Sequence, residues 1–182
     1  MNKPQIYLII SICVNILLVA IIFFKIALNN LVLEKIKEIK EKKKAEIDHD
    51  KNKFQEIEKI LPEDKLRWWL DYFENIAPVP FVLSTSLFSL QEYHKNIHGI
   101  FINRKIQKQF NAFISKVDIL AKFLGDHYWV IRGNTDITKM YPDDERDSPR
   151  YVEAKKMAPD IASDFLKNYC NFRLEVKKRL LI

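Results

Sequence analysis

The sequence predicts an all-α protein with a single N-terminal transmembrane helix, a helical stalk and a C-terminal domain like a four-helix bundle. The run Ile6–Phe24 contains no charge, proline or glycine. The whole chain holds only three glycines, which weighs against an all-β protein or a Gly-rich phosphate loop. Most of the chain after residue 62 repeats its apolar residues every three or four positions, as amphipathic helices do.

The apolar run Ile6–Phe24 predicts a membrane anchor over residues 1–27. As a helix it would cover roughly 28 Å, close to the hydrocarbon thickness of a bilayer. A helix satisfies its own backbone hydrogen bonds, as the bilayer interior requires. A cleaved signal peptide is the alternative. The run is longer than a usual signal core, however, and no small-residue cleavage site follows it.

Flanking lysines predict the orientation of this single span. Lys3 precedes it, and many more lysines follow it: Lys25, Lys35, Lys37, Lys40, Lys42, Lys43 and Lys44. Because basic residues remain on the cytoplasmic side, we expect the N-terminus outside and the C-terminal domain in the cytoplasm. Cys13 and Cys170 are not expected to form a disulfide, and free thiols fit that compartment.

Two polar residues inside the anchor, Ser11 and Asn15, lie four positions apart and therefore share one helix face. We expect them to contact a neighbouring membrane helix, because polar side chains in lipid need hydrogen-bond partners. The alternative is that each bonds back to its own helix or to interfacial water.

Residues 28–61 contain neither proline nor glycine and predict a helical stalk. Apolar residues recur there at helical spacing: Leu28, Val32, Ile36, Ile39, Ile47, Phe54, Ile57 and Leu61. Lys43 and Asp50 interrupt this stripe, so we favour a solvated stalk over a weak parallel coiled coil that would oligomerise the protein.

The expected cytosolic domain, residues 62–182, begins with a helix that starts at Pro62 and ends before Pro78. Trp68 points away from the apolar face of that helix. The face itself comprises Leu66, Trp69, Leu70, Phe73 and Ala77.

Three further helices are expected. The first is capped by Ser84, Thr85 or Ser86 and ends at Gly99. The second is capped by Asn103 and ends at Gly125. The last begins at Ser148-Pro149 and continues through a kink at Pro159, because its apolar stripe keeps its phase there.

Residues 126–148 show no sustained period. Tyr128–Ile131 has the composition of a short strand, but no partner strand is predicted. Long aperiodic connections are often functional, so we expect a partner or ligand surface here, with Trp68 as a further contact. The alternative is that the aromatic residues only cover the end of the bundle. The expected binding residues are Trp129, Arg132, Tyr141, Asp144 and Trp68.

No enzyme signature is present in the sequence. His94 and His98 have the spacing of a metal-binding face, but Lys95 follows His94 where the metalloprotease motif has glutamate. Ser84 and Ser86 lack the sequence of a nucleophile elbow. We therefore expect no catalysis, no metal and no cofactor.

The formal charge of +6 arises from many charges of both signs. Nucleic acid is not an expected partner, because no motif of stacking aromatic residues accompanies the charge. The expected partners are membrane lipid and a protein, either a different one or a second copy. The sequence favours a membrane-anchored, non-catalytic interaction module. The alternative is a membrane-tethered sensor-effector whose cytosolic domain binds a ligand, such as a nucleotide, and signals to the membrane helix.

Overall fold

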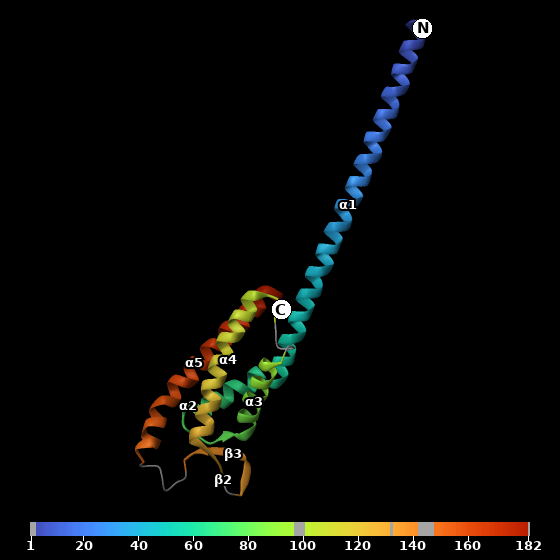
Figure 1. Cartoon of the computed structure of the whole chain (residues 1–182). Coiled ribbons are helices and arrows are strands. Elements are labelled where there is room, and N and C mark those ends of the chain that lie inside the picture. Colours follow the sequence, from blue (N-terminus) through green and yellow to red (C-terminus); the bar gives the residue numbers. More distant parts are fainter. Residues whose placement is uncertain (1–2, 97–100, 132, 142–147, 182) are drawn as a thin grey trace. The chain divides into compact units, whose positions relative to one another are not determined.

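The computed structural model describes residues 3–96, 101–131, 133–141 and 148–181 (Figure 1). Its helices confirm the all-α class: α1 (Lys3–Ile60), α2 (Glu63–Glu74), α3 (Phe81–Lys95), α4 (Arg104–His127) and α5 (Pro149–Leu180). Three short strands accompany them: β1 (Val79–Pro80), β2 (Tyr128–Ile131) and β3 (Asn134–Met140). The chain divides into two compact units, Met1–Ala45 and Glu46–Ile182. We call the second one the helical unit.

The first unit consists of the leading part of α1. Among the described residues, α1 is the one helix that is long and apolar enough to cross a membrane. Beyond the apolar run its side chains face solvent, and Lys37 forms an exposed ion pair with Glu41 one turn later. This part of α1 therefore has the solvated surface expected of a stalk.

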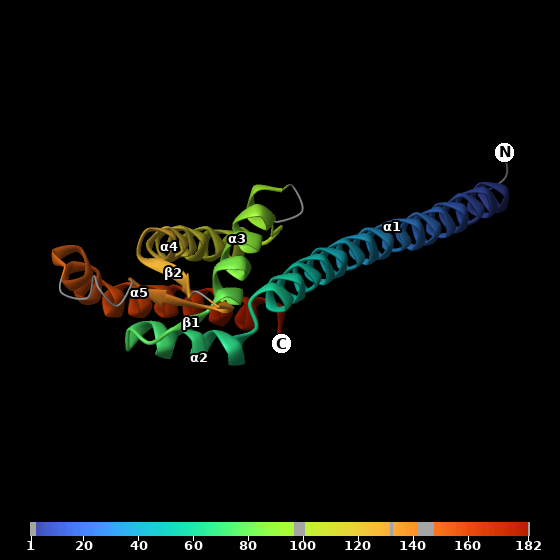
Figure 2. The same ribbon diagram turned by 90° about the horizontal axis from the view of Figure 1, so that it is seen from below.

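In the helical unit, α3 packs against α4 and α2 packs against α5, and Figure 2 shows α5 between α4 and α2. The main helix–helix interface joins α4 to α5, which run antiparallel. The four helices expected after residue 62 are all present. The unit also includes the last turns of α1 and a small sheet, so its arrangement is more complex than four helices alone.

Helix α4 shows most directly how the sequence produces the core. Its predicted apolar stripe is fully buried: Ile106, Phe110, Phe113, Val117, Leu120 and Leu124. The predicted cap is confirmed, because the Asn103 side chain accepts hydrogen bonds from the backbone N–H groups of Lys105 and Ile106. The expected stop at Gly125 is wrong. The helix continues to His127 and passes directly into the extended backbone of Tyr128, so it needs no left-handed residue there.

Helix α3 begins earlier than expected. It starts at Phe81, directly after the extended Pro80, and the Thr85 hydroxyl donates to the carbonyl of Val82 within the helix. The predicted cap at Ser84–Ser86 is therefore wrong, because the proline already fixes the backbone at the helix entry. The expected stop at Gly99 lies outside the described residues.

The strand expected at Tyr128–Ile131 does form, but the prediction that it lacks a partner is wrong. The strands form an antiparallel sheet in the order β1-β3-β2, in which Thr138 of β3 lies opposite both Val130 and Val79. The turn between β2 and β3 includes Gly133, whose φ of 88° suits glycine. The first three residues of β3, Asn134–Asp136, are polar and exposed, and the buried Thr138 is also polar, so the sequence shows no alternation of apolar and polar residues for this strand.

Helix α5 confirms its predicted start and continuity. The Ser148 side chain accepts a hydrogen bond from the backbone of Tyr151, and Pro149 occupies the first turn. The helix continues through Pro159, with one buried stripe on both sides of it. That stripe includes Ala154, Ala158, Ala162, Phe165, Tyr169, Phe172, Val176 and Leu180.

The last turns of α1 belong to the core of the helical unit, which begins at Glu46 and not at residue 62. Phe54, Ile57 and Leu61 are buried there. Asp50 is only 2% exposed, and its two carboxylate oxygens accept hydrogen bonds from the backbone N–H groups of Ile102 (2.8 Å) and Asn103 (2.9 Å). The polar residue that interrupts the stripe thus ties α1 to the start of α4.

Two further polar contacts hold the same turns of α1. The Tyr93 hydroxyl of α3 donates to Glu56 at 2.7 Å. On the other side, Arg173 of α5 pairs with Glu58 and, at 2.9 Å, with Glu63 of α2. The end of α1 is therefore bound to α3, α4 and α5, each through a different side chain.

Candidate functional site

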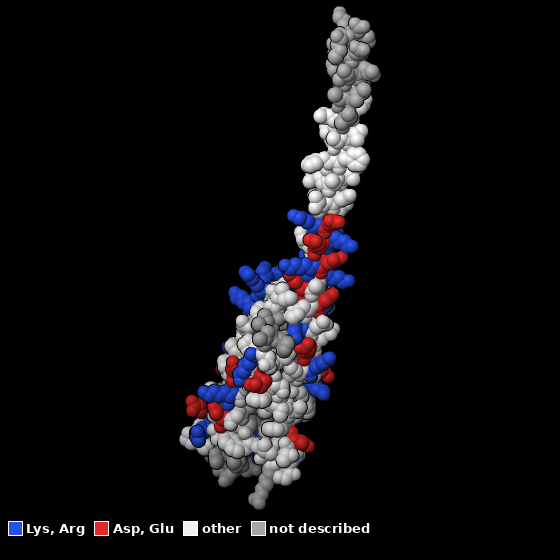
Figure 3. All heavy atoms as spheres, turned by 45° about the vertical axis from the view of Figure 1, so that its right-hand side comes forward, with Lys and Arg blue, Asp and Glu red and all other residues white. Residues whose placement is uncertain are grey.

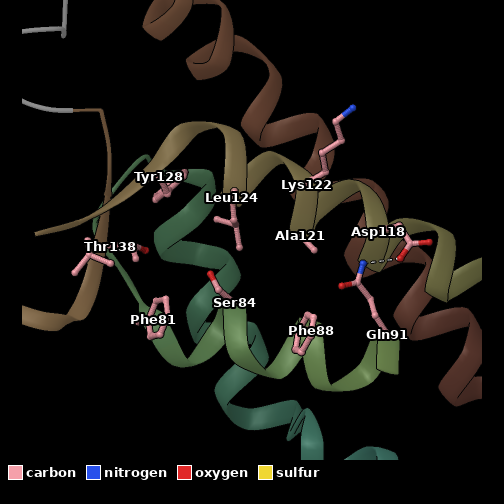
Figure 4. Close-up of a pocket in the computed structure, with 12 residues that line it drawn as sticks. Phe81, Ser84, Phe88, Gln91, Asp118, Ala121, Lys122, Leu124, Tyr128 and Thr138 are labelled. Carbon is pink, nitrogen blue, oxygen red and sulfur yellow. Dashed lines mark hydrogen bonds between the residues drawn. The ribbon is translucent and has the colours of Figure 1, made fainter. Parts of the chain in front are cut away.

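A groove of about 440 Å³ lies between α3, α4 and the sheet (Figure 4). It adjoins the region expected to bind a partner, because Tyr128, Val130 and Thr138 line it. Its lining residues come from all three elements: Phe81, Ser84, Phe88, Gln91, Asp118, Ala121, Lys122, Leu124, Gly125, Tyr128, Val130 and Thr138.

Helix α3 forms one wall of the groove, because one of its faces packs into the core and an adjacent face lines the groove. Leu83, Leu87 and Leu90 point into the core. Phe81, Ser84, Phe88 and Gln91 follow the same spacing on an adjacent face and line the groove. Phe88 is 61% exposed, so most of its ring remains in contact with water.

The hollow exists because the facing residues are small. Ser84 points from α3 toward α4, where Ala121 and Gly125 have little or no side chain (Figure 4). A Cβ atom placed on Gly125 would meet no atom within 4 Å, so the helix backbone itself is accessible. At the α3 end, the Gln91 amide donates to Asp118 at 2.7 Å and links the two walls.

The sheet closes the other end of the groove. The Thr138 hydroxyl donates to the carbonyl of Val79 and so joins β3 to β1. The Tyr128 hydroxyl is the one buried side-chain polar atom of the described residues that has no hydrogen-bond partner. Its burial raises the pKa of Tyr128. Val130, two residues further along β2, shares this face and is about half-exposed.

The two outer strands of the sheet differ in how they are protected. β1 is two residues long, lies between Pro78 and α3, and ends in Pro80. β2 has the sequence Tyr-Trp-Val-Ile, without lysine or proline, and no described strand pairs with its outer side. Edge strands normally carry charges or prolines that prevent pairing with another chain. β2 therefore presents an apolar strand edge beside the groove.

The binding residues expected in the 126–148 region have different environments. Trp129 is half-exposed, and its ring centroid lies 4.9 Å from that of Tyr141. Tyr141 is only 2% exposed, has a left-handed backbone (φ 56°) and lies with its hydroxyl 2.8 Å from Nδ1 of His127. The buried Tyr141 ring thus packs against the inner side of the half-exposed Trp129 ring. Arg132 and Asp144 lie outside the described residues.

The other expected contact residues do not line the groove. Trp68 is half-exposed on α2, and its ring lies 4.6 Å from that of Tyr72, so the two form a separate aromatic pair. Asn15 is exposed on α1. Ser11 lies in the same helix, but its side chain is outside the described part of the chain.

The histidines considered for metal binding have ordinary contacts. Nε2 of His94 lies 3.4 Å from the side-chain oxygen of Asn111, and the ring packs against Phe110. His98 is outside the described residues. Within the described ranges, no three His, Cys, Asp or Glu side chains are grouped so that they could hold a metal ion.

Sequence reasoning missed most of the groove. Several groove residues lie off the buried stripes of α3 and α4, so in the sequence they are indistinguishable from residues on the solvated side of a helix. These residues are Phe81, Phe88, Gln91 and Asp118. The available signal was Phe88, a large aromatic residue off the buried stripe of its helix. Comparison of the chain with protein-family models, with curated proteins and with solved structures finds no match.

Proposed function

We propose that the protein is a membrane-anchored, non-catalytic interaction module. In this proposal α1 holds the chain in the membrane with the helical unit in the cytoplasm, and the groove between α3, α4 and β2 binds another protein. The lysines after the apolar run support this orientation.

One observation carries the proposal: a groove with exposed aromatic side chains lies beside an unprotected apolar strand. Phe81 and Phe88 are exposed at one wall, and Val130 is exposed at the sheet. Contiguous apolar surface of this kind is typical of a binding site, because a partner that covers it removes it from water.

The chemistry of the groove favours an extended segment of the partner. Such a segment would pair its backbone with the outer side of β2 and place an apolar side chain between Phe81 and Phe88. The strand edge would supply affinity through main-chain hydrogen bonds, while the groove would select the side chain.

The residues of the groove favour binding over catalysis. Its lining includes neither histidine nor cysteine among the described residues, so Ser84 has no histidine beside it in the groove. The Asp118 carboxylate already accepts the Gln91 amide. These side chains are suited to contact and not to proton transfer.

The test places a photo-crosslinking amino acid at position 88 of the full-length protein in its native membrane. We expect a discrete protein adduct, which Val130→Lys should reduce at least tenfold by charging the strand edge. The matched control position is Val152, a partly exposed residue of α5 that does not line the groove. Equal adducts at positions 88 and 152, or no loss with Val130→Lys, would contradict the proposal.

The sensor-effector is a second candidate, favoured by the three side-chain ties between the end of α1 and the rest of the unit. Occupation of the groove would then alter the membrane helices. The measurement is disulfide formation between copies carrying Asn15→Cys in a background without native cysteines, before and after photo-crosslinking at position 88. An unchanged rate leaves the interaction module as the function.

A further inference from the structure

The helical unit has a strongly basic end, where α4 begins and α5 ends. Figure 3 shows Lys and Arg atoms gathered over this end of the unit. Five cationic side chains are exposed there: Arg104, Lys105, Lys108, Lys177 and Lys178. We call this surface the basic end. The hairpin of β2 and β3 follows the other end of α4.

Two acidic groups at the basic end, Glu175 and Asp50, are already engaged. Glu175 accepts a hydrogen bond from Arg179 at 2.7 Å. That bond, together with the charges of Arg179, Lys178 and Lys105, lowers the pKa of Glu175. Asp50 is buried against backbone N–H groups. The charge that α4 and α5 expose at this end is therefore mainly positive.

Large apolar side chains are exposed among these cations. Leu174 is 64% exposed, and it shares one face of α5 with Lys177 and Lys178, three and four residues later. Ile102 is 47% exposed just before α4. Cations that flank exposed aliphatic side chains are the combination by which helices bind anionic membrane surfaces: the cations contact headgroups and the aliphatic groups enter the boundary below them.

The chain itself connects this surface with a membrane. Asp50 bonds to Ile102 and Asn103, so α1 joins the helical unit at the basic end. We infer that the basic end docks on anionic phospholipid headgroups of the membrane that α1 spans. The inference rests on the anchor of the proposed function and is independent of the groove.

Docking sets a condition on the stalk. As a helix, residues 25–45 would extend about 30 Å, whereas electrostatic attraction is screened over about 8 Å at physiological salt. The stalk must therefore allow the basic end to come within this distance of the headgroups. The stalk exposes aliphatic residues that include Leu28, Val32 and Ile36, and Lys35 and Lys37 flank Ile36, a combination that suits the membrane interface.

The experiment uses the full-length protein in nanodiscs, with Cys13→Ser, Cys170→Ser and a fluorophore on Leu174→Cys. The discs contain phosphatidylcholine alone or mixed with phosphatidylglycerol, each with a trace of headgroup-quencher lipid. We expect at least threefold stronger quenching in the anionic discs. Raising the salt from about 0.1 M to about 1 M should remove this difference, since screening shortens from about 10 Å to about 3 Å.

Two controls separate docking from other effects. A fluorophore on Thr135→Cys, an exposed position of the hairpin, should remain unquenched in both kinds of disc. Lys177→Gln with Lys178→Gln should abolish quenching at position 174, whereas Lys177→Arg with Lys178→Arg should retain it. Circular dichroism confirms that each variant is folded.

The outcomes distinguish the two proposals. Failure of the protein to enter nanodiscs would overturn the anchor and the docking together. Stable insertion without quenching in anionic discs would overturn docking alone and assign the basic end to an acidic protein. Equal quenching in neutral and anionic discs, or at positions 174 and 135, would also refute the inference, because neither result requires the basic end.

Discussion

The two ends of the helical unit place their aromatic residues differently. At the basic end, the buried Phe172 ring packs against Phe54, Phe101, Phe110 and Phe113 with centroids 5.3–5.9 Å apart. At the hairpin end, the Trp129 side chain is half-exposed and rests on Tyr141. One end uses its aromatic rings to hold α1, α4 and α5 together, and the other leaves part of its aromatic surface in water.

This difference indicates that stability and recognition depend on separate residues. Truncation of buried side chains inside the basic end should lower the free energy of unfolding. Truncation of exposed side chains around the groove should leave that free energy nearly unchanged and act on binding. Four substitutions test this contrast, all measured by urea unfolding of the full-length protein in detergent micelles and followed by circular dichroism.

Phe172→Ala should have the largest effect, with a loss of about 3–5 kcal/mol in the free energy of unfolding, because it empties a buried aromatic site that joins three helices. The matched control is Phe88→Ala, which removes a mostly exposed ring of the groove and should change stability by less than about 0.5 kcal/mol. Similar losses from both variants would abolish the distinction between the two ends.

Asp50→Ala should lower the free energy of unfolding by about 2–3 kcal/mol, because it leaves the N–H groups of Ile102 and Asn103 without their charged acceptor. Asp48, two residues earlier, is exposed on the same helix. Asp48→Ala should change stability by about 0.5 kcal/mol or less. If the two aspartates prove equivalent, α1 is not held by the contact at position 50.

Gly133→Ala, in the hairpin turn, should cost about 1–2 kcal/mol. A Cβ atom there meets nothing within 4 Å, so the cost comes only from the left-handed backbone at φ 88°. The far-ultraviolet spectrum of the folded state should be unchanged. A neutral effect would mean that the turn readily adopts another conformation.

Gly125→Ala should have the smallest effect and the opposite sign. Its position lies inside α4, with open space around a new Cβ, so alanine should stabilise the unit by about 0.5–1 kcal/mol. The added methyl group also enters the groove, so recovery of the partner should fall while stability rises. Destabilisation at Gly125 would show that this part of α4 is not helical.

The sequence predicted the elements that have one regular buried face. Residues Ile106–Leu124 and the stripe of α5 across Pro159 are examples, because each repeats over many turns. It failed for β3, in which most side chains are polar. It also failed for Asp50, which interrupts an apolar stripe in the sequence but accepts a hydrogen bond from Ile102 in the structure. The exposure of Trp68 was predicted correctly, since that residue lies opposite a clear apolar face.

The groove could not be predicted from the sequence, because it depends on residues whose side chains are small or, for glycine, absent. Ser84, Ala121 and Gly125 attract no attention in their own helices, and only the packing of α3 on α4 brings them opposite one another. The expected surface at residues 126–148 does adjoin the groove through Tyr128, Val130 and Thr138. Tyr141, expected to meet a partner, is instead buried under Trp129.

The burial of Phe54, Ile57 and Leu61 has a consequence for self-association through α1. Those three residues form the second half of the apolar stripe that a parallel coiled coil would need, and the helical unit already covers them. Only Leu28, Val32, Ile36 and Ile39 remain exposed for a second copy, which is shorter than the several heptads that a stable coiled coil requires. The part of the stripe after residue 46 can therefore serve either the core of the helical unit or a coiled coil, but not both at once. A chain that extended its coiled coil past residue 46 would have to unfold its own core.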